Sequence, residues 1–385
     1  MKPEWNIGRT SRRSGLVGLV LALGAVACDG FPDRDVVGPS EDSSEDRGAE
    51  VSAVTGEVLK GLGHGVYGIG KLKRTVPDPC PDPGHEDFDF WLGTWELENA
   101  DTGAPVGTSV ITSELDGCVV MEDVVAANGF PSRSLSVFDP ATGDWHQSFV
   151  TGNTTNIRFT GGLQGDAMVM TASALAFDLA TGTVGLRENR VSWRPKPDGT
   201  LSQVVEASFD GTPRPTVEFL YEPASSIDRP DRQFLPFCQA SVIPGFRELD
   251  FWLGSWEVSA TSGPKLGSSE VVTRVNDCLI VEDFVTPKGM QSRSYVFYDF
   301  ATATWHRSYI DENGEYVTLS GGLEQDGGSP EMVMTGTDVG PNGEEFDLRV
   351  TIAPLGPDLV RQTWEVSDDG GASWKPALSL DYEAS

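Results

Sequence analysis

Residues 78–385 consist of short apolar stretches rich in Val, Thr, Phe, Tyr and Trp, which Gly, Asp, Asn or Pro interrupts every eight to twelve residues. Helical periodicity is nearly absent, and only short turns are expected around residues 87–92 and 248–253. Clear examples of the apolar stretches are residues 118–126, 145–151, 279–286 and 305–310. This spacing is typical of an all-β sandwich or barrel.

The chain contains the same pattern twice. Asp-Phe-Trp-Leu-Gly-Thr-Trp-Glu at residues 89–96 returns as Asp-Phe-Trp-Leu-Gly-Ser-Trp-Glu at residues 250–257. Further matched pairs follow in the same order, at an offset near 160 residues: Cys118 and Cys278, Glu122 and Glu282, Arg133 and Arg293, His146 and His306, Tyr221 and Tyr382. An offset of this size fits a whole domain and is too long for a solenoid unit. We therefore expect two tandem antiparallel β-barrel domains at residues 78–224 and 236–385, joined by a linker at 225–235.

The N-terminus has the composition of an export signal. Several basic residues precede an apolar run at residues 16–27, which suits a secretory signal and is too short for a membrane-spanning helix. The run ends Ala-Val-Ala before Cys28, which resembles a bacterial lipobox, so we expect a lipoprotein signal peptide at residues 1–27 and a lipid on Cys28. A plain secreted protein, a retained helix and export by the twin-arginine route are the alternatives. We expect the protein in the bacterial cell envelope.

Residues 28–77 and the overall charge limit the classes of partner. The segment is acidic at first and then glycine-rich, a composition that buries too little apolar surface to fold. We expect it to form a disordered stalk between the lipid and the first barrel. The formal net charge of −30 at pH 7 repels phosphate backbones, so we expect no nucleic-acid partner. The expected contact with the membrane is through the lipid at Cys28.

Four cysteines remain once Cys28 is assigned to the lipid. Each repeat has one cysteine before its Asp-Phe-Trp motif and one well after it. Four cysteines allow three pairings, and the repeat symmetry selects Cys80–Cys118 and Cys238–Cys278. Export permits disulfides, and a closed loop of roughly forty residues stabilises a domain by roughly 4 kcal/mol.

The repeated opening motif resembles that of a bacterial family of unknown function with lipocalin-like barrels. It is also similar to the Gly-x-Trp signature of lipocalins and to the Leu-Gly-Thr-Trp opening of nitrobindin-like haem barrels. The resemblance covers both repeats and implies a lipocalin-like barrel in which the motif's tryptophans close one end. It assigns this plug to Trp91, Trp95, Trp252 and Trp256. It also implies a small ligand inside the barrel.

One glutamate in each repeat lies in a stretch that is apolar on both faces of the expected strand. Glu122 and Glu282 therefore need polar partners inside their barrels. The Asn-Gly pair after the first stretch predicts a two-residue hairpin turn. Such a turn places Leu135 opposite Glu122, with Arg133 one diagonal away on the same face. The same geometry relates Glu282 to Arg293, so we expect one Glu–Arg pair per barrel. Its interpretations are a structural salt bridge, an anchor for the polar end of a ligand, or a catalytic role.

The histidines are candidates for ligand contacts and not for metal or haem. His146 and His306 follow a tryptophan on an expected strand, and neighbouring residues of a strand point to opposite faces. A polar contact to a bound ligand is one interpretation, and a structural or solvent-facing side chain is the other. Nitrobindin-like proteins hold haem through a histidine near the end of the domain, and neither repeat has a later histidine. We expect no metal and no cofactor, since the few histidines do not cluster.

The leading functional prediction is the binding of a small, largely apolar molecule in one or both barrels. Glu122, Arg133 and His146, with Glu282, Arg293 and His306, would set its orientation. The alternatives are a structural or envelope-interaction module with filled barrels and a hydrolase of unknown substrate. No catalytic residue is assigned, because no serine elbow or His-Glu-x-x-His motif is present. An interior below about 300 Å³ per barrel would favour filled barrels.

Overall fold

The computed structural model describes residues 80, 82–152, 155–178, 182–227, 238, 243–261, 263–325, 329–339 and 345–385. Each repeat forms a closed antiparallel barrel of ten main strands, which confirms the predicted all-β class and tandem architecture. The expected signal peptide at residues 1–27, the lipidation site Cys28 and the stalk lie outside the described residues, as does most of the expected linker. None of the described helices is long and apolar enough to cross a membrane.

Barrel 1 is built from neighbouring hairpins and closes where β8 pairs with β9. The spatial order from β1 to β9 follows the sequence, and β11 lies between β9 and β1. The two-residue strand β10 pairs only with β9. The strands are β1 (Gly93–Asn99), β2 (Pro105–Glu114), β3 (Val119–Ala126), β4 (Pro131–Asp139), β5 (Asp144–Thr151), β6 (Asn156–Gln164), β7 (Ala167–Asp178), β8 (Thr183–Pro195), β9 (Leu201–Phe209), β10 (Thr212–Pro213) and β11 (Val217–Pro223).

Barrel 2 repeats this topology, with consecutive strands paired in order and β12 pairing with β21 to close it. Alternation of buried and exposed positions along β12 and β13 reflects one face turned to the core and one to solvent. The strands are β12 (Gly254–Ala260), β13 (Lys265–Arg274), β14 (Leu279–Val285), β15 (Gln291–Asp299), β16 (Thr304–Asp311), β17 (Tyr316–Glu324), β18 (Glu331–Val339), β19 (Glu345–Gly356), β20 (Leu359–Ser367) and β21 (Lys375–Ala384).

Short 3-10 turns lead into the first strand of each barrel, at the two places where the sequence predicts them. The described turns are η2 (Pro83–Glu86), η3 (Asp89–Trp91), η4 (Leu115–Gly117), η5 (Pro244–Arg247) and η6 (Asp250–Trp252). Trp91 is fully buried, and Trp95 Nε1 donates a hydrogen bond to its carbonyl oxygen at 2.9 Å. A Cβ on Gly93, where φ is +144°, would lie 3.3 Å from that indole nitrogen. Trp252 and Trp256 repeat the arrangement, with a hydrogen bond of 3.0 Å.

Two disulfides tie these entrance segments to their barrels. They join Cys80 to Cys118 and Cys238 to Cys278, which is the pairing that the repeat symmetry selects. The bridged residues are 38 and 40 positions apart in the sequence. Each bridge therefore closes a loop of nearly the same length at the same place in its barrel.

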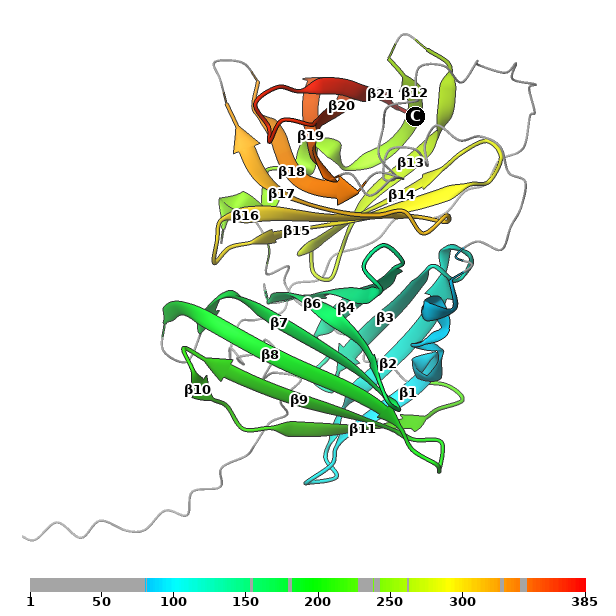
Figure 1. The fold of residues 1–385 in the computed structure, drawn as a ribbon, viewed down its shortest axis with the longest axis vertical. Helices are drawn as coiled ribbons and strands as arrows, with labels where there is room; N and C mark the ends of the chain where they lie inside the picture. The colour runs from blue at the N-terminus through cyan, green and yellow to red at the C-terminus, as the bar shows by residue number, and fades with distance from the viewer. Residues whose placement is uncertain are drawn as a thin grey trace, which may run out of the picture.

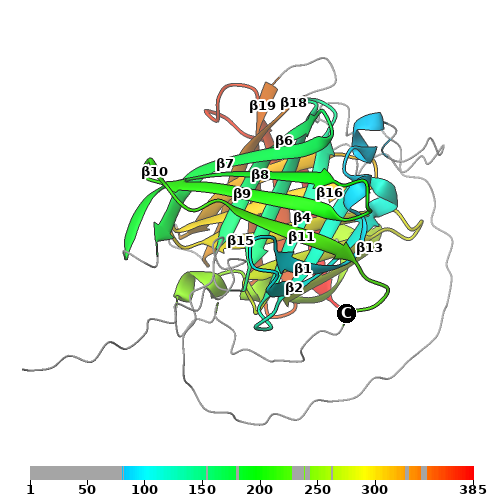
Figure 2. The ribbon, with the colours of Figure 1, turned by 90° about the horizontal axis from the view of Figure 1, so that it is seen from below.

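The barrels pack against each other through the outer faces of β3–β5 and β14–β16 (Figure 1). The view from below places the strands of barrel 1 in front of those of barrel 2 (Figure 2). Leu135, Val137 and Val150 of barrel 1 are buried in one hydrophobic cluster with Tyr295 and Ile310 of barrel 2. Strands at the contact are therefore apolar on both faces, with one face in the barrel core and the other in the interface.

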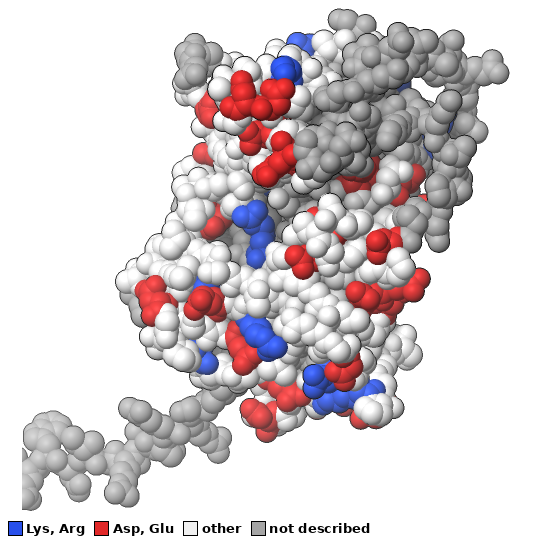
Figure 3. Space-filling model, viewed as in Figure 1, with Lys and Arg blue, Asp and Glu red and all other residues white. Residues whose placement is uncertain are grey.

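Equivalent residues meet at the centre of this contact. Ser148 Oγ and Ser308 Oγ lie 3.2 Å apart, and the two serines are 160 positions apart in the sequence. Nearby, Tyr295 Oη lies 3.1 Å from Met121 Sδ. At this point the two repeats therefore contact each other through the same position of their sequences. On the face that Figure 3 shows, carboxylates outnumber cations, in keeping with the net charge of −30.

Candidate functional site

The register of the β3–β4 and β14–β15 hairpins decides which side chains enter the barrels. Ala126 N–H donates to Phe130 O at 2.9 Å and Gly129 N–H donates to Ala126 O at 2.7 Å, so the loop has three residues. Gly129 has a φ of +90°, as expected for a three-residue loop that ends in a left-handed glycine. Glu122 therefore lies opposite Ser134. The predicted two-residue turn, with Leu135 opposite Glu122, is wrong by one position.

This one-residue difference places the arginines on the outer face, because a slip of one position exchanges the two faces of a strand. The predicted Glu122–Arg133 and Glu282–Arg293 pairs are therefore wrong. Arg133 instead donates two hydrogen bonds to Asp123, at 2.6 and 2.8 Å. Arg293 pairs with Asp283 at 2.5 Å and also with a carboxylate of β2 in the other barrel, that of Glu114.

The two histidines also lie on the outer faces of β5 and β16, at the contact between the barrels. The His146 ring stacks on Tyr316 of barrel 2 with 5.3 Å between ring centroids. His306 Nδ1 lies 2.9 Å from Ser320 Oγ. Burial lowers the pKa of both imidazoles, and that of His306 falls to about 3. Neither histidine faces a barrel interior, so this geometry does not support the predicted ligand contact.

Glu122 is the carboxyl group at the centre of barrel 1, and it is 4% exposed. Three hydroxyl groups donate hydrogen bonds to it: Ser109 at 2.9 Å, Ser134 at 3.3 Å and Tyr221 at 3.4 Å. Burial raises the pKa of Glu122 to about 7 and outweighs the hydroxyl groups, which lower it. The carboxyl group therefore changes its charge near neutral pH.

Glu282 of barrel 2 accepts hydrogen bonds from the equivalent three hydroxyl groups and also pairs with a cation. The hydroxyl donors are Ser269 at 3.1 Å, Ser294 at 2.9 Å and Tyr382 at 2.8 Å. Arg307 Nη2 lies 3.0 Å from Glu282 Oε2, and the arginine is 1% exposed. Its guanidinium carbon lies 5.3 Å from the ring centroids of both Trp252 and Trp364, within the range of cation–π attraction. Barrel 2 thus neutralises its central carboxylate internally.

Barrel 1 has a glutamine in the place of this arginine. Gln147 pairs with Ser136 across β4 and β5, as Arg307 pairs with Val296 across β15 and β16. Gln147 Nε2 donates a hydrogen bond to Ser136 Oγ at 2.9 Å, whereas a valine side chain has no acceptor. No Lys or Arg among the described residues forms a salt bridge with Glu122.

A cavity of about 40 Å³ lies inside barrel 1 beside Glu122. It is lined by Leu97, Glu122, Val124, Gln147, Phe149, Phe159, Val191, Trp193, Gln203, Phe219 and Tyr221. Sites for drug-sized ligands span roughly 300–1,000 Å³, so this cavity is too small for the apolar ligand expected from the sequence. A single water needs about 10–15 Å³ on the same measure, so the cavity admits a few heavy atoms.

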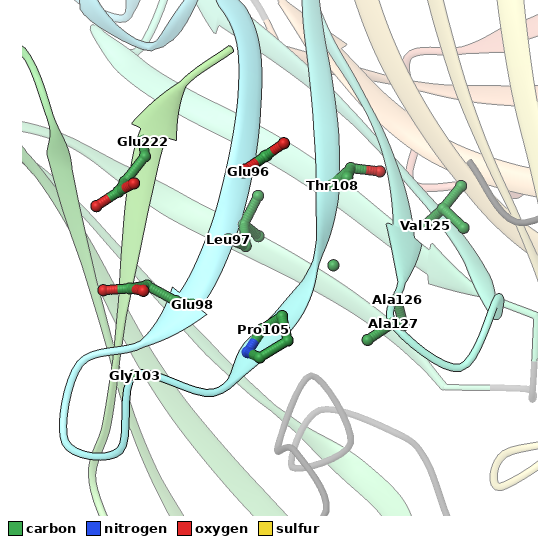
Figure 4. A pocket seen from close by; sticks show the side chains of 11 residues that line it. Glu96, Leu97, Glu98, Gly103, Pro105, Thr108, Val125, Ala126, Ala127 and Glu222 are labelled. Atoms are coloured by element: carbon green, nitrogen blue, oxygen red, sulfur yellow. The ribbon is translucent and has the colours of Figure 1, made fainter. Parts of the chain in front are cut away.

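A larger hollow of about 400 Å³ lies on barrel 1 beside the loop between β1 and β2. Figure 4 shows Glu96 and Glu98 on β1 and Glu222 on β11 around it. Glu96 and Glu222 are exposed, so this is a surface feature. Within the described residues, no group of three or more His, Cys, Asp and Glu side chains is placed to hold a metal ion. We assign no ligand to this hollow.

Comparison with protein-family models and with curated protein sequences gives no match. Among solved structures, a DUF3598-family protein of unknown function from Nostoc punctiforme matches with a TM-score of 0.18 and 10% identity, over 79% of this chain and 100% of that one. A mutant of the vaccine antigen transferrin-binding protein B from Haemophilus parasuis matches with a TM-score of 0.18 and 9% identity, over 76% of each chain. We draw no functional conclusion from these two similarities. The class that the fold itself defines is a tandem β-barrel protein.

Proposed function

We propose that this protein is a binding protein in which the interior of barrel 1 holds a small polar molecule, or the polar end of a larger one, against Glu122. The observation that carries the proposal is a buried carboxyl group beside a cavity, with no Lys or Arg paired to it in the described part of the chain. Ligand sites are typically cavities in which a few polar groups converge on otherwise apolar walls. Barrel 2, whose carboxylate is already neutralised by Arg307, serves as a structural partner.

Native mass spectrometry of the protein purified from its own host tests this proposal. The wild-type protein should retain a bound mass that Glu122→Gln reduces severalfold, because the charged acceptor is lost. Glu222→Gln changes an exposed carboxylate of the same barrel and should retain the mass as the wild type does. An unliganded spectrum for the wild type would contradict the proposal.

The second candidate is a structural module whose barrels are both filled. The barrel 1 cavity measures about 40 Å³, far below the roughly 300 Å³ of the smallest typical ligand sites. This small volume favours the filled barrel. In that case the cavity holds only water. The same mass spectra separate the two candidates, because a filled module retains no ligand and is unaffected by Glu122→Gln.

We also propose that the protein is exported and anchored through a lipid on Cys28. The two disulfides support export, because such bridges persist in oxidising compartments. In a bacterial host that receives labelled palmitate, the wild-type protein should incorporate the label and Cys28→Ser should not. Equal labelling of both proteins would contradict the lipid anchor.

A further inference from the structure

We infer that barrel 1 recognises a small guanidinium-bearing cation, held in the place that the Arg307 guanidinium occupies in barrel 2. This inference rests on the proposed function, and it names the chemical class of the ligand. Barrel 2 provides the template, since it holds a guanidinium against a buried carboxylate within the same fold. Barrel 1 has the carboxylate and a cavity beside it, with Glu122 and Gln147 both in the lining.

The acceptor side of the site is nearly identical in the two barrels. The matched pairs are Glu122 and Glu282, Ser109 and Ser269, Ser134 and Ser294, Tyr221 and Tyr382, Gln203 and Gln362. In barrel 2, Ser294 Oγ accepts from Arg307 Nε and Nη2 at 3.2 and 2.9 Å, beside Glu282. Ser134 offers an equivalent acceptor beside Glu122. Together, these groups form a duplicated site of which one copy already binds a guanidinium.

The donor side differs because Ser136 holds the glutamine away from the carboxylate. Gln147 Nε2 donates to Ser136 Oγ at 2.9 Å, whereas the hydrogen bonds to Glu122 come from Ser109, Ser134 and Tyr221. A guanidinium is planar and delocalised and donates in a fixed fork that matches a carboxylate. Its four heavy atoms suit a cavity of about 40 Å³, which holds about three waters on the same measure.

Charge supports the same class of ligand. Burial of an ionised carboxylate is costly unless a cation pairs with it. The neighbouring charge that raises the pKa of Glu122 is that of another acid, Asp123. An incoming cation would favour the ionised form of Glu122. Binding should therefore tighten as the pH rises through about 7, the pKa of Glu122.

The test compares methylguanidinium with N-methylurea, its uncharged analogue, by ligand-observed NMR titration of the full-length protein at pH 8. Both probes are used at low millimolar concentrations to avoid denaturation. Methylguanidinium should bind the wild type with a Kd about tenfold or more below that of N-methylurea, since charge assistance is worth at least that factor. Glu122→Gln should remove this preference. Gln147→Arg, which supplies the guanidinium covalently, should abolish binding, and Glu222→Gln should leave it unchanged.

A rescue experiment in barrel 2 covers the case in which an interior variant of barrel 1 does not fold. In the otherwise wild-type chain, Arg307→Ala should lower the Tm, because Glu282 loses its cation. Methylguanidinium should then raise the Tm of Arg307→Ala by more than it raises that of the wild type, and N-methylurea should raise neither. The inference would be overturned if the two probes bound equally, or if Gln147→Arg still bound methylguanidinium. In either case the proposed function stands as long as native mass spectrometry still shows a retained ligand. Binding of neither probe overturns the inference, and an unliganded mass spectrum then overturns the proposed function as well.

Discussion

Replacing Arg307 with methionine should lower the free energy of unfolding by about 3–5 kcal/mol at pH 8, because Glu282 then remains buried without its cation. Methionine is flexible and can pack between Trp252 and Trp364, so the loss reflects charge more than an empty space. Urea unfolding followed by tryptophan fluorescence measures the free energy of unfolding of both proteins.

Gln147→Met is the matched control for this prediction, since it changes the equivalent position of barrel 1. It removes one hydrogen bond to Ser136 and should cost only about 1 kcal/mol. Adding Glu282→Gln to Arg307→Met should recover most of the stability, because a buried pair replaced by neutral groups is often tolerated. If Arg307→Met cost no more than Gln147→Met at pH 8, Arg307 would not be needed to neutralise barrel 2.

Glu122→Gln should remove a decline in stability that the wild-type protein shows as the pH rises. Because burial raises the pKa of Glu122 from 4.5 to about 7, the folded protein keeps a proton that the unfolded chain has lost within this range. The contribution to the free energy of unfolding is fully present below pH 4.5 and falls by about 3 kcal/mol as the pH rises through 7. Urea unfolding at intervals between pH 4.5 and 8.5 measures the change.

The difference between variant and wild type isolates this group. The lowered pKa values of His146 and His306 affect both proteins alike, so their contribution cancels. Glu222→Gln serves as the surface control and should follow the wild-type curve. Parallel curves for Glu122→Gln and the wild type would mean that Glu122 does not change its protonation on folding.

The fold was predictable because its determinants are local. Alternating apolar residues and regularly placed turn residues specify antiparallel strands, and the repeated motif specifies two domains. The contact between the barrels was not predictable in the same way. Residues such as Leu135, Val137 and Val150 make their strands apolar on both faces, but periodicity cannot tell whether an outer face is covered by the same domain, another domain or a ligand.

The candidate site was predictable only in part. The sequence identified Glu122 and Glu282 as buried acids, because carboxylates within apolar strands need partners. It assigned the wrong arginines, since an Asn-Gly pair favours a two-residue turn and the structure has a three-residue loop. Arg307 was missed, although it shares a strand face with Trp305 and Tyr309. Its proximity to Glu282 depends on the register of three strands, which a single sequence does not fix.

The contact of Ser148 with its equivalent Ser308 resembles the centre of a symmetric homodimer, in which one surface patch meets its own copy. Here both copies belong to one polypeptide, so their association is intramolecular and does not weaken on dilution. A substitution in one repeat leaves the other repeat unchanged, whereas in a homodimer it would appear in both subunits. The two barrels can therefore differ in their interiors. Glu114 pairs with Arg293 across the contact, and a strictly symmetric dimer would have to accommodate that pair on both sides.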